Sequence, residues 1–342
     1  NGLFAYLLAR SFTESKWVAL AAGCVALSNP LVIQDINGTG LRQVLLWWLL
    51  LFPVVLRRAM RTTRAVDGIW VGVVFSLIAT FYWFYGLFAA IFGVIAIGFW
   101  VGRVRPGWRR TIRWIWPAAL VSVVALSLFL LPYFAAGQSD QMRSGMTDLP
   151  ELSFFLSFPA YDTIASAPLR PSKYEENVLS SLRRVIVSAW PGDYVVNPFH
   201  GVSAFPSLVF FVGVLPGVFI RRARMWVATW ALFWVGTMGP FLKVGADRDA
   251  TDVLMLGEYV VRLPYTIMFK WIPGMSRMFA PYRMSSMMVV AGVVLVAIGL
   301  GALSRRWRMP ASILVGIGIV AQPFWHVDVG PVAEGSIAPS PW

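Results

Sequence analysis

Long runs of apolar residues, separated by short polar clusters, make up most of the chain. Runs of about 17–25 apolar residues are long enough to cross a membrane as helices. The pattern predicts ten segments: Asn1–Arg10, which is short, Lys16–Ile33, Leu41–Leu56, Val66–Phe81, Phe84–Val101, Ile112–Pro132, Phe205–Ile220, Trp226–Leu242, Met284–Leu303 and Met309–His326. We therefore expect an all-α polytopic bundle of about nine to ten spans, with residues 1–342 as a single transmembrane domain.

One apolar stretch, Val66–Val101, is too long for a single span, and it carries no charge after Asp67. Its middle holds the aromatic segment FYWFYG, Phe81–Gly86. We predict that the chain turns there, with Tyr82 and Tyr85 at the membrane surface. These rings could stack on a sugar or a prenyl chain, or belong to the aromatic belt common to membrane proteins.

Composition supports the membrane interpretation. The chain is 58% hydrophobic and 13% charged, whereas soluble domains are about 45–50% apolar and about 25% charged. Its single cysteine, Cys24, excludes an intrachain disulfide and a cysteine-rich metal site.

Charge is distributed unevenly between the two sides of the predicted bundle. The short turns on one side hold only two acids, Glu14 and Asp67. They hold 17 of the 29 basic residues: Arg10, Lys16, Arg57, Arg58, Arg61, Arg64, Arg103, Arg105, Arg109, Arg110, Arg113, Arg221, Arg222, Arg224, Arg305, Arg306 and Arg308. Basic residues in short loops mark the cytoplasmic side. The net charge of +13 is therefore explained by the orientation of the chain in the membrane, and it implies no nucleic-acid partner.

The opposite, extracytoplasmic side carries two long loops, 134–204 and 243–283. In the first, the apolar spacing of Glu175–Trp190 predicts an amphipathic helix. In the second, Tyr265–Ile272 is too short to cross and suits a re-entrant or interfacial element. The chain also begins within an apolar run and without Met, so we expect a fragment of a longer protein.

Candidate binding residues lie in two segments on this outer side. The turn Gln34–Gln43 places Asp35, Arg42 and Gln43 at the membrane surface. Asp35 suits a general base or a ligand contact, and it also suits a plain polar turn with an interfacial carboxylate.

The second segment is Trp271–Ser286, WIPGMSRMFAPYRMSS, which holds Arg277, Tyr282 and Arg283. Its two prolines prevent one continuous helix, and its arginines are too costly to leave in hydrocarbon. A guanidinium fork suits phosphate oxygens. Snorkelling of both arginines to lipid headgroups is the alternative.

Evidence for metal or nucleotide binding is weak. The loop GADRDATD offers Asp247, Asp249 and Asp252, but its spacing departs from that of an EF-hand. No nucleotide-binding glycine motif occurs. We expect no cofactor and no metal site, although a divalent cation remains an open alternative.

The order GPFLKVG, then LPYTIMFKWIPGMSRMFAPYRMSS, then a glycine-rich span resembles bacterial glycosyltransferase-like proteins of the GT-C superfamily, akin to the YfhO group and to mannosyl- and arabinosyltransferase-like families. Gly239-Pro240, Leu263-Pro264-Tyr265, Pro273 and Arg283 match the pattern. The chain departs from it at the first arginine of an R-x-P-x-R motif, where Met278 or Phe279 stands with Arg277 nearby.

The resemblance implies a GT-C-like fold in the bacterial cytoplasmic (inner) membrane. It also implies transfer of a sugar from a polyprenyl-phosphate donor to a glycan or lipid acceptor on the outer face. In such families the principal acid usually lies in the first outer loop, which would precede Asn1, so Asp35 would assist. A transporter or flippase of lipid-linked glycans and a non-catalytic envelope-assembly protein are the alternative functions.

Overall fold

The computed structural model describes the chain at residues 1–27, 46–137, 208–237, 255–256, 259–260, 263–272, 275 and 281–326. Within these ranges the protein is helical, apart from one two-residue antiparallel pair of strands, β1 (Met255–Leu256) and β2 (Tyr259–Val260). The apolar pattern does not predict this pair. The amphipathic helix expected at Glu175–Trp190 lies outside the described residues.

Each of the ten predicted apolar segments contains a helix, which confirms the all-helical prediction for the described part of the chain. These helices are α1 (Gly2–Arg10), α2 (Lys16–Leu27), α5 (Trp47–Thr62), α6 (Ala65–Phe81), α7 (Trp83–Val104), α8 (Trp108–Gly137), α13 (Leu208–Val218), α14 (Arg224–Thr237), α16 (Ser285–Ala302) and α17 (Arg305–His326). Three shorter elements connect or flank them: the 3-10 turns η1 (Arg221–Ala223) and η3 (Pro281–Met284), and the helix α15 (Tyr265–Trp271).

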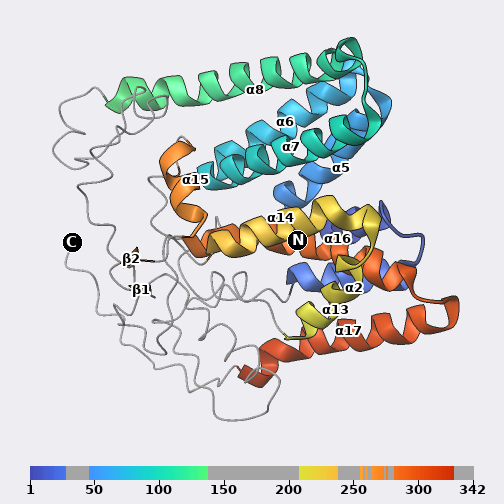
Figure 1. Ribbon diagram of the computed structural model, residues 1–342. Helices are drawn as coiled ribbons and strands as arrows, with labels where there is room; N and C mark the ends of the chain where they lie inside the picture. Colours follow the sequence, from blue (N-terminus) through green and yellow to red (C-terminus); the bar gives the residue numbers. More distant parts are fainter. Residues whose placement is uncertain are drawn as a thin grey trace, which may run out of the picture.

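The long helices form two groups whose axes run in roughly one direction (Figure 1). In one group, α6 packs against α5, α7 and α8. In the other, α16 packs against α2, α13 and α14, and α17 packs against α2. Helix α1 touches both groups, through α2 and α5.

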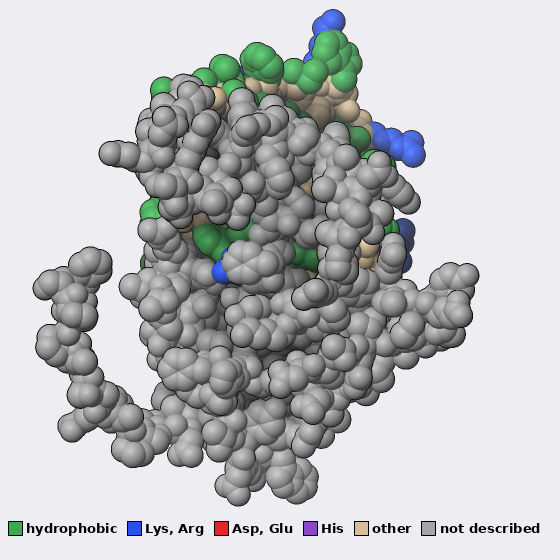
Figure 2. Space-filling model, turned by 90° about the vertical axis from the view of Figure 1, so that its left-hand side faces the viewer, with side chains coloured by type: hydrophobic (Ala, Val, Ile, Leu, Met, Phe, Trp, Pro, Cys, Tyr) green, Lys and Arg blue, Asp and Glu red, His purple; other side chains and the backbone are tan. Residues whose placement is uncertain are grey.

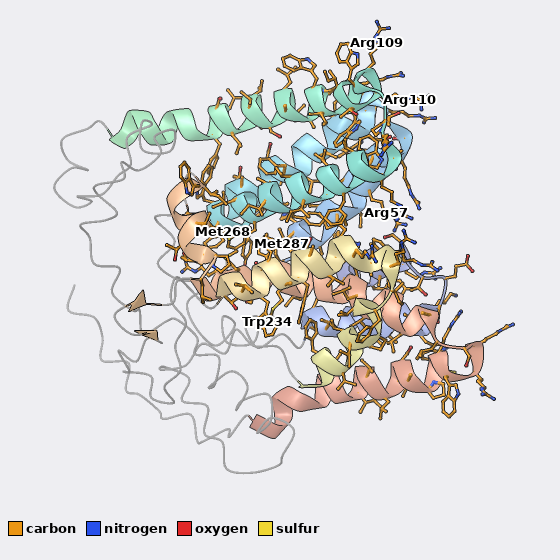
Figure 3. The ribbon with its side chains drawn as sticks, viewed as in Figure 1. Arg57, Arg109, Arg110, Trp234, Met268 and Met287 are labelled. Atoms are coloured by element: carbon orange, nitrogen blue, oxygen red, sulfur yellow. The ribbon has the colours of Figure 1, made fainter. Side chains whose placement is uncertain are left out.

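The two ends of the bundle differ in chemistry. At one end, here called the basic end, lie the turns that carry Arg10, Arg57, Arg109, Arg221 and Arg305. Figure 3 shows Arg109 and Arg110 pointing outward there, and it labels Arg57 at the same end. At the other end, here called the aromatic end, α6 meets α7 and η3 precedes α16. Among the described residues, the helix order therefore gathers the predicted basic turns at one end of the bundle.

Helix α16 forms the centre of its group. Every residue from Ser285 to Leu300 is buried, and the helix carries no charged residue. Its residues are mainly valine, alanine, glycine and methionine, whose small or flexible side chains let neighbouring helices approach. At Gly299, an added Cβ would lie 2.7 Å from the backbone nitrogen of Gly217 on α13. At this point α13 and α16 meet backbone to backbone.

A second close contact joins α6 to α8. On α6, Gly68, Gly72 and Ser76 recur at four-residue intervals and therefore share one helix face. A Cβ at Gly68 would overlap the carbonyl group of Trp114, and one at Gly72 would lie 2.5 Å from the carbonyl oxygen of Ala118. Glycine at these two positions therefore allows the backbones of α6 and α8 to approach more closely than any other residue would.

In the described part of the chain, three helices are long and apolar enough to cross a membrane, by length and composition: Trp83–Val104, Trp108–Phe129 and Ser285–Ala302. Their surroundings differ. In the most apolar part of Ser285–Ala302, 89% of the residues are buried, against 11% in the most apolar part of Trp108–Phe129. Helix α8 lies at the edge of the bundle (Figure 1).

The predicted division of Val66–Val101 is confirmed. Helix α6 ends at Phe81 and α7 begins at Trp83, so Tyr82 alone connects them, in an extended conformation (φ −156°, ψ 110°). The amide N–H of Tyr85 donates to the Tyr82 carbonyl at 2.9 Å, and that of Tyr82 donates to the Ile78 carbonyl at 3.0 Å. One residue is enough because both helix ends satisfy their backbone groups locally.

The bounds of some helices differ from the prediction. Helix α5 continues past Leu56 to Thr62, because a helix end outside the apolar run can carry arginines that point away from the bundle. It stops at Thr63, whose φ of 51° is left-handed. Helix α15 occupies most of the predicted short element Tyr265–Ile272.

Enlarging Gly72 tests the α6–α8 contact. We expect Gly72→Ala to lower the free energy of unfolding by about 1–3 kcal/mol, the usual cost of overpacking. The matched control is Gly102→Ala on α7, where an added Cβ meets nothing within 4 Å. It should be neutral or stabilising by up to about 1 kcal/mol, because alanine is the better helix former. Unfolding in mild detergent measures both; equal stability of the two variants would contradict the close contact.

Candidate functional site

Arg283 lies at the aromatic end, in the 3-10 turn η3 that leads into α16. The Ser286 hydroxyl donates to the Arg283 carbonyl at 2.9 Å. The next residue, Met284, is fully buried and packs against Gly236 of α14, where an added Cβ would meet its sulfur at 2.5 Å. The backbone of Arg283 is thus fixed by two helices, while its side chain is half-buried.

The Arg283 guanidinium lies over aromatic rings at the start of α7. Its Cζ atom is 5.5 Å from the ring centroid of Tyr82 and 5.8 Å from that of Phe84. A cation within about 6 Å of a ring centroid is attracted by the ring quadrupole. Two segments about 200 residues apart in sequence therefore meet here.

Tyr82 belongs to a connected set of rings. It lies edge-to-face with Tyr85 at 4.8 Å and with Phe84 at 5.7 Å between centroids. Tyr85 is buried and continues inward to Phe88, at 6.2 Å. The rings hold Tyr82 in place, so the guanidinium rests on a fixed surface. The arginine and these three rings thus form one cluster, here called the Arg283 cluster (Arg283, Tyr82, Phe84 and Tyr85).

Buried methionines and a half-buried tryptophan lie toward this end of the bundle. Met268 of α15, Met287 of α16 and Trp234 of α14 lie toward the aromatic end (Figure 3). Met284, Met287 and Met288 are fully buried. Methionine fills irregular space because its side chain is unbranched and flexible.

Figure 2 looks onto the aromatic end and shows hydrophobic and basic side-chain atoms between the grey ones. A cationic group at this end is therefore accompanied by apolar side chains. That combination is the chemistry needed to hold a phosphate attached to a hydrocarbon chain.

The predicted site residues divide by whether the structure describes them. Arg283, Tyr82 and Tyr85 are described, and the structure brings them together. Asp35, Arg42, Gln43 and Arg277 lie outside the described residues, and so does the Tyr282 side chain. Sequence reasoning did not single out Phe84, although it stands within the quoted aromatic segment. The described residues contain no cluster of three or more metal-ligating side chains.

Arg57 and Arg58, at the basic end, have partners on other elements of the fold. Arg57 donates to the backbone carbonyl of Ser11 and, at 3.2 Å, to its hydroxyl, and its Cζ atom lies 4.0 Å from the Phe12 ring centroid. Arg58 Nε is 2.8 Å from the Oδ1 atom of Asp67. These contacts join the α1–α2 turn to α5 and the end of α5 to α6. Sequence counting had treated both arginines only as topology signals.

Asp67 is a buried carboxylate with two partners. Besides the Arg58 ion pair, its Oδ2 atom accepts a hydrogen bond from the Thr62 hydroxyl at 2.5 Å. The side chain of Asp67 is 5% exposed, whereas that of Arg58 is 72% exposed. Its oxygens are engaged in holding the α5–α6 turn, so this group is structural.

Comparison of the chain with protein-family models, with curated proteins and with solved structures finds no match.

A double-mutant cycle between Arg283 and Tyr82 measures their interaction. We expect Arg283→Met and Tyr82→Leu to show a coupling of about 0.5–1 kcal/mol in the free energy of unfolding, the usual size of a cation–π contact. The control cycle pairs Tyr82→Leu with Arg110→Met at the opposite end, and it should be additive. Additivity in both cycles would show that the guanidinium and the ring do not interact.

Proposed function

We propose that this protein is a polytopic membrane protein that binds a polyprenyl-phosphate-linked sugar at the Arg283 cluster and transfers the sugar on the extracytoplasmic face, as a GT-C-like glycosyltransferase. The observation that carries the proposal is the position of Arg283. Among the arginines that the structure describes, it alone lies at the aromatic end, half-buried against tyrosine and phenylalanine rings.

The exposed surface supports the membrane assignment. Large apolar side chains are open on the outer helices, including Leu128 (68% exposed), Val94 (74%) and Leu314 (74%). Water would make such a surface unfavourable, whereas lipid tails accept it. The arginines of the basic end are then at headgroup level, and their excess orients that end toward the cytoplasm.

This orientation supports a lipid-linked donor. The aromatic end then faces outward, where a donor embedded in the bilayer can present its phosphate at headgroup depth. No soluble nucleotide is needed, and the chain carries no nucleotide-binding glycine motif.

The proposed chemistry is a displacement at the anomeric carbon of the sugar. The bond from this carbon to the phosphate oxygen breaks, and the bond to the acceptor hydroxyl oxygen forms. The guanidinium of Arg283 stabilises the negative charge on the departing phosphate, where low dielectric strengthens the contact. A carboxylate takes the acceptor proton, and Asp35 is the candidate for an assisting acid.

The described helices favour transfer over transport. Transporters commonly place ions and substrates at broken helices near the membrane midplane. Here α16 is continuous, buried and uncharged, and the described arginines lie at helix ends. The proposed site is therefore at one membrane surface, as expected for an enzyme whose donor and acceptor meet there.

Cysteine labelling tests the proposed orientation. Helix α8 has 30 residues, or about 45 Å of helix, so its two ends reach opposite sides of a bilayer. In a Cys24→Ser background, an impermeant thiol reagent added outside cells should label Gly137→Cys and leave Gly107→Cys unlabelled. Permeabilised cells serve as the control, since both positions should then react. Labelling of Gly107→Cys alone in intact cells would contradict the orientation.

Substitution of Arg283 tests the proposed function. A charge-assisted contact to phosphate contributes about 1.5–3 kcal/mol, so Arg283→Ala should weaken binding of a polyprenyl phosphate about ten- to a hundredfold. Arg283→Lys should recover only part of this loss, because lysine lacks the planar fork. Binding is measured with the purified protein in detergent, and release of polyprenyl phosphate from a labelled donor measures transfer.

Two controls make the result specific. Arg110→Ala removes an exposed arginine at the opposite end, and it should bind the lipid like the wild type. A polyprenol of equal length lacks the phosphate, and it should bind wild type and Arg283→Ala alike. Equal affinity of Arg283→Ala and Arg110→Ala for polyprenyl phosphate would show that Arg283 is not part of the site. Binding without donor consumption would favour a flippase.

A further inference from the structure

Helix α8 leaves one face open over residues 108–129, the part whose side chains the structure describes. On its other side it packs against α6 and α5. Eight of its exposed residues recur every three or four positions, which places them on one face of the helix. They are Arg109, Ile112, Arg113, Trp116, Leu120, Val123, Val124 and Leu128, and Trp108, Arg110, Ala119, Ser127 and Phe129 are exposed as well.

This face changes character along the helix axis in a fixed order. Arg109 and Arg113 stand in the first two turns, at the basic end. Trp116, 65% exposed, comes one turn later, and Leu120 (50%) and Val123 (63%) follow. This order matches the layers of a membrane leaflet: arginine suits the headgroups, the tryptophan indole suits the interface, and aliphatic side chains suit the hydrocarbon.

The arginines of this turn have no internal partner. The structure shows no hydrogen bond or ion pair from the side chains of Arg109, Arg110 or Arg113 to any part of the chain that it describes. This differs from Arg57 and Arg58, which are bonded within the protein. The charges of Arg109, Arg110 and Arg113 are therefore available to a ligand outside the chain.

We propose that this face of α8 binds an anionic diacyl phospholipid of the cytoplasmic leaflet. The headgroup phosphate contacts Arg109 and Arg113, and an acyl chain lies along Trp116, Leu120 and Val123. The lengths agree: one leaflet of hydrocarbon is about 15 Å thick, or about ten residues of helix. Arg113 and Val123 are separated by that interval in the sequence.

Two comparisons favour a lipid over other ligands. A nucleic acid or a free phosphate would contact the arginines but leave the apolar part of the face uncovered. One of the other basic clusters, Arg221–Arg224, leads into α14, where Trp226, Trp230 and Phe233 are buried. That cluster therefore lacks an open apolar face along the helix that follows it. The proposal does not depend on sugar transfer, because its site lies at the opposite end of the bundle.

Lipid photocrosslinking tests the proposal with the full chain. The purified protein is placed in phosphatidylcholine vesicles that contain a small fraction of phosphatidylglycerol with a photoactivatable acyl chain. The crosslinked peptide is then identified by mass spectrometry. Wild type should crosslink within Arg113–Leu128, and excess unlabelled phosphatidylglycerol should compete where added phosphatidylcholine or inorganic phosphate does not.

Charge variants give the matched control. Each basic residue near an anionic surface contributes about fivefold in affinity, so Arg109→Gln with Arg113→Gln should reduce crosslinking of α8 about 25-fold. The same pair changed to lysine should keep most of it and shows that the fold is intact. Arg221→Gln with Arg222→Gln removes equal charge at the same end and should leave α8 crosslinking within about twofold of wild type.

Three results would overturn the proposal. Equal losses in both glutamine pairs would mean a diffuse electrostatic attraction without a site. Unchanged crosslinking in Arg109→Gln with Arg113→Gln would mean that the arginines hold no headgroup. Displacement by millimolar inorganic phosphate would identify a soluble anion as the ligand in place of the lipid.

Discussion

The free-energy cost of placing a guanidinium among apolar side chains organises this molecule. The described helices are built almost wholly from apolar residues, and their arginines stand at helix ends. A cation in the middle of such a bundle would be desolvated without compensation. The helices run up and down the bundle, so successive turns alternate between its two ends. The arginine-rich turns then fall at the same end. The bundle thereby acquires a basic end and an aromatic end.

Close backbone packing then holds the helices together. Apolar side chains gain little by leaving lipid for protein, so helices in a membrane associate mainly through van der Waals contact and hydrogen bonds. Gly72 against Ala118 and Gly217 against Gly299 are contacts of this kind. They explain how α16 is enclosed by its neighbours although it has no charged side chain to direct them.

Arginine has three different uses in this structure. Arg57 and Arg58 bond to Ser11 and Asp67, and so connect elements of the fold. Arg109 and its neighbours face outward and are free to meet anionic headgroups. Arg283 rests on Tyr82 at the opposite end, where we propose that it receives the phosphate of a donor lipid. The charge is the same in each case, and the surroundings decide its role.

The sequence by itself determined where the helices form and which of their ends carry the charge. Apolar runs bounded by arginines, and the aromatic break at Phe81–Gly86, were sufficient for that. Of the candidate site, it selected Tyr82, Tyr85 and Arg283 separately but could not join them, because their contact depends on how α7 packs beside η3. Tertiary structure also decided that α16 is buried and α8 is exposed. In the most apolar part of each helix, 89% of the residues of α16 are buried, against 11% of those of α8. Lipid and protein interior are both apolar solvents, so composition cannot distinguish a helix that faces one from a helix that faces the other.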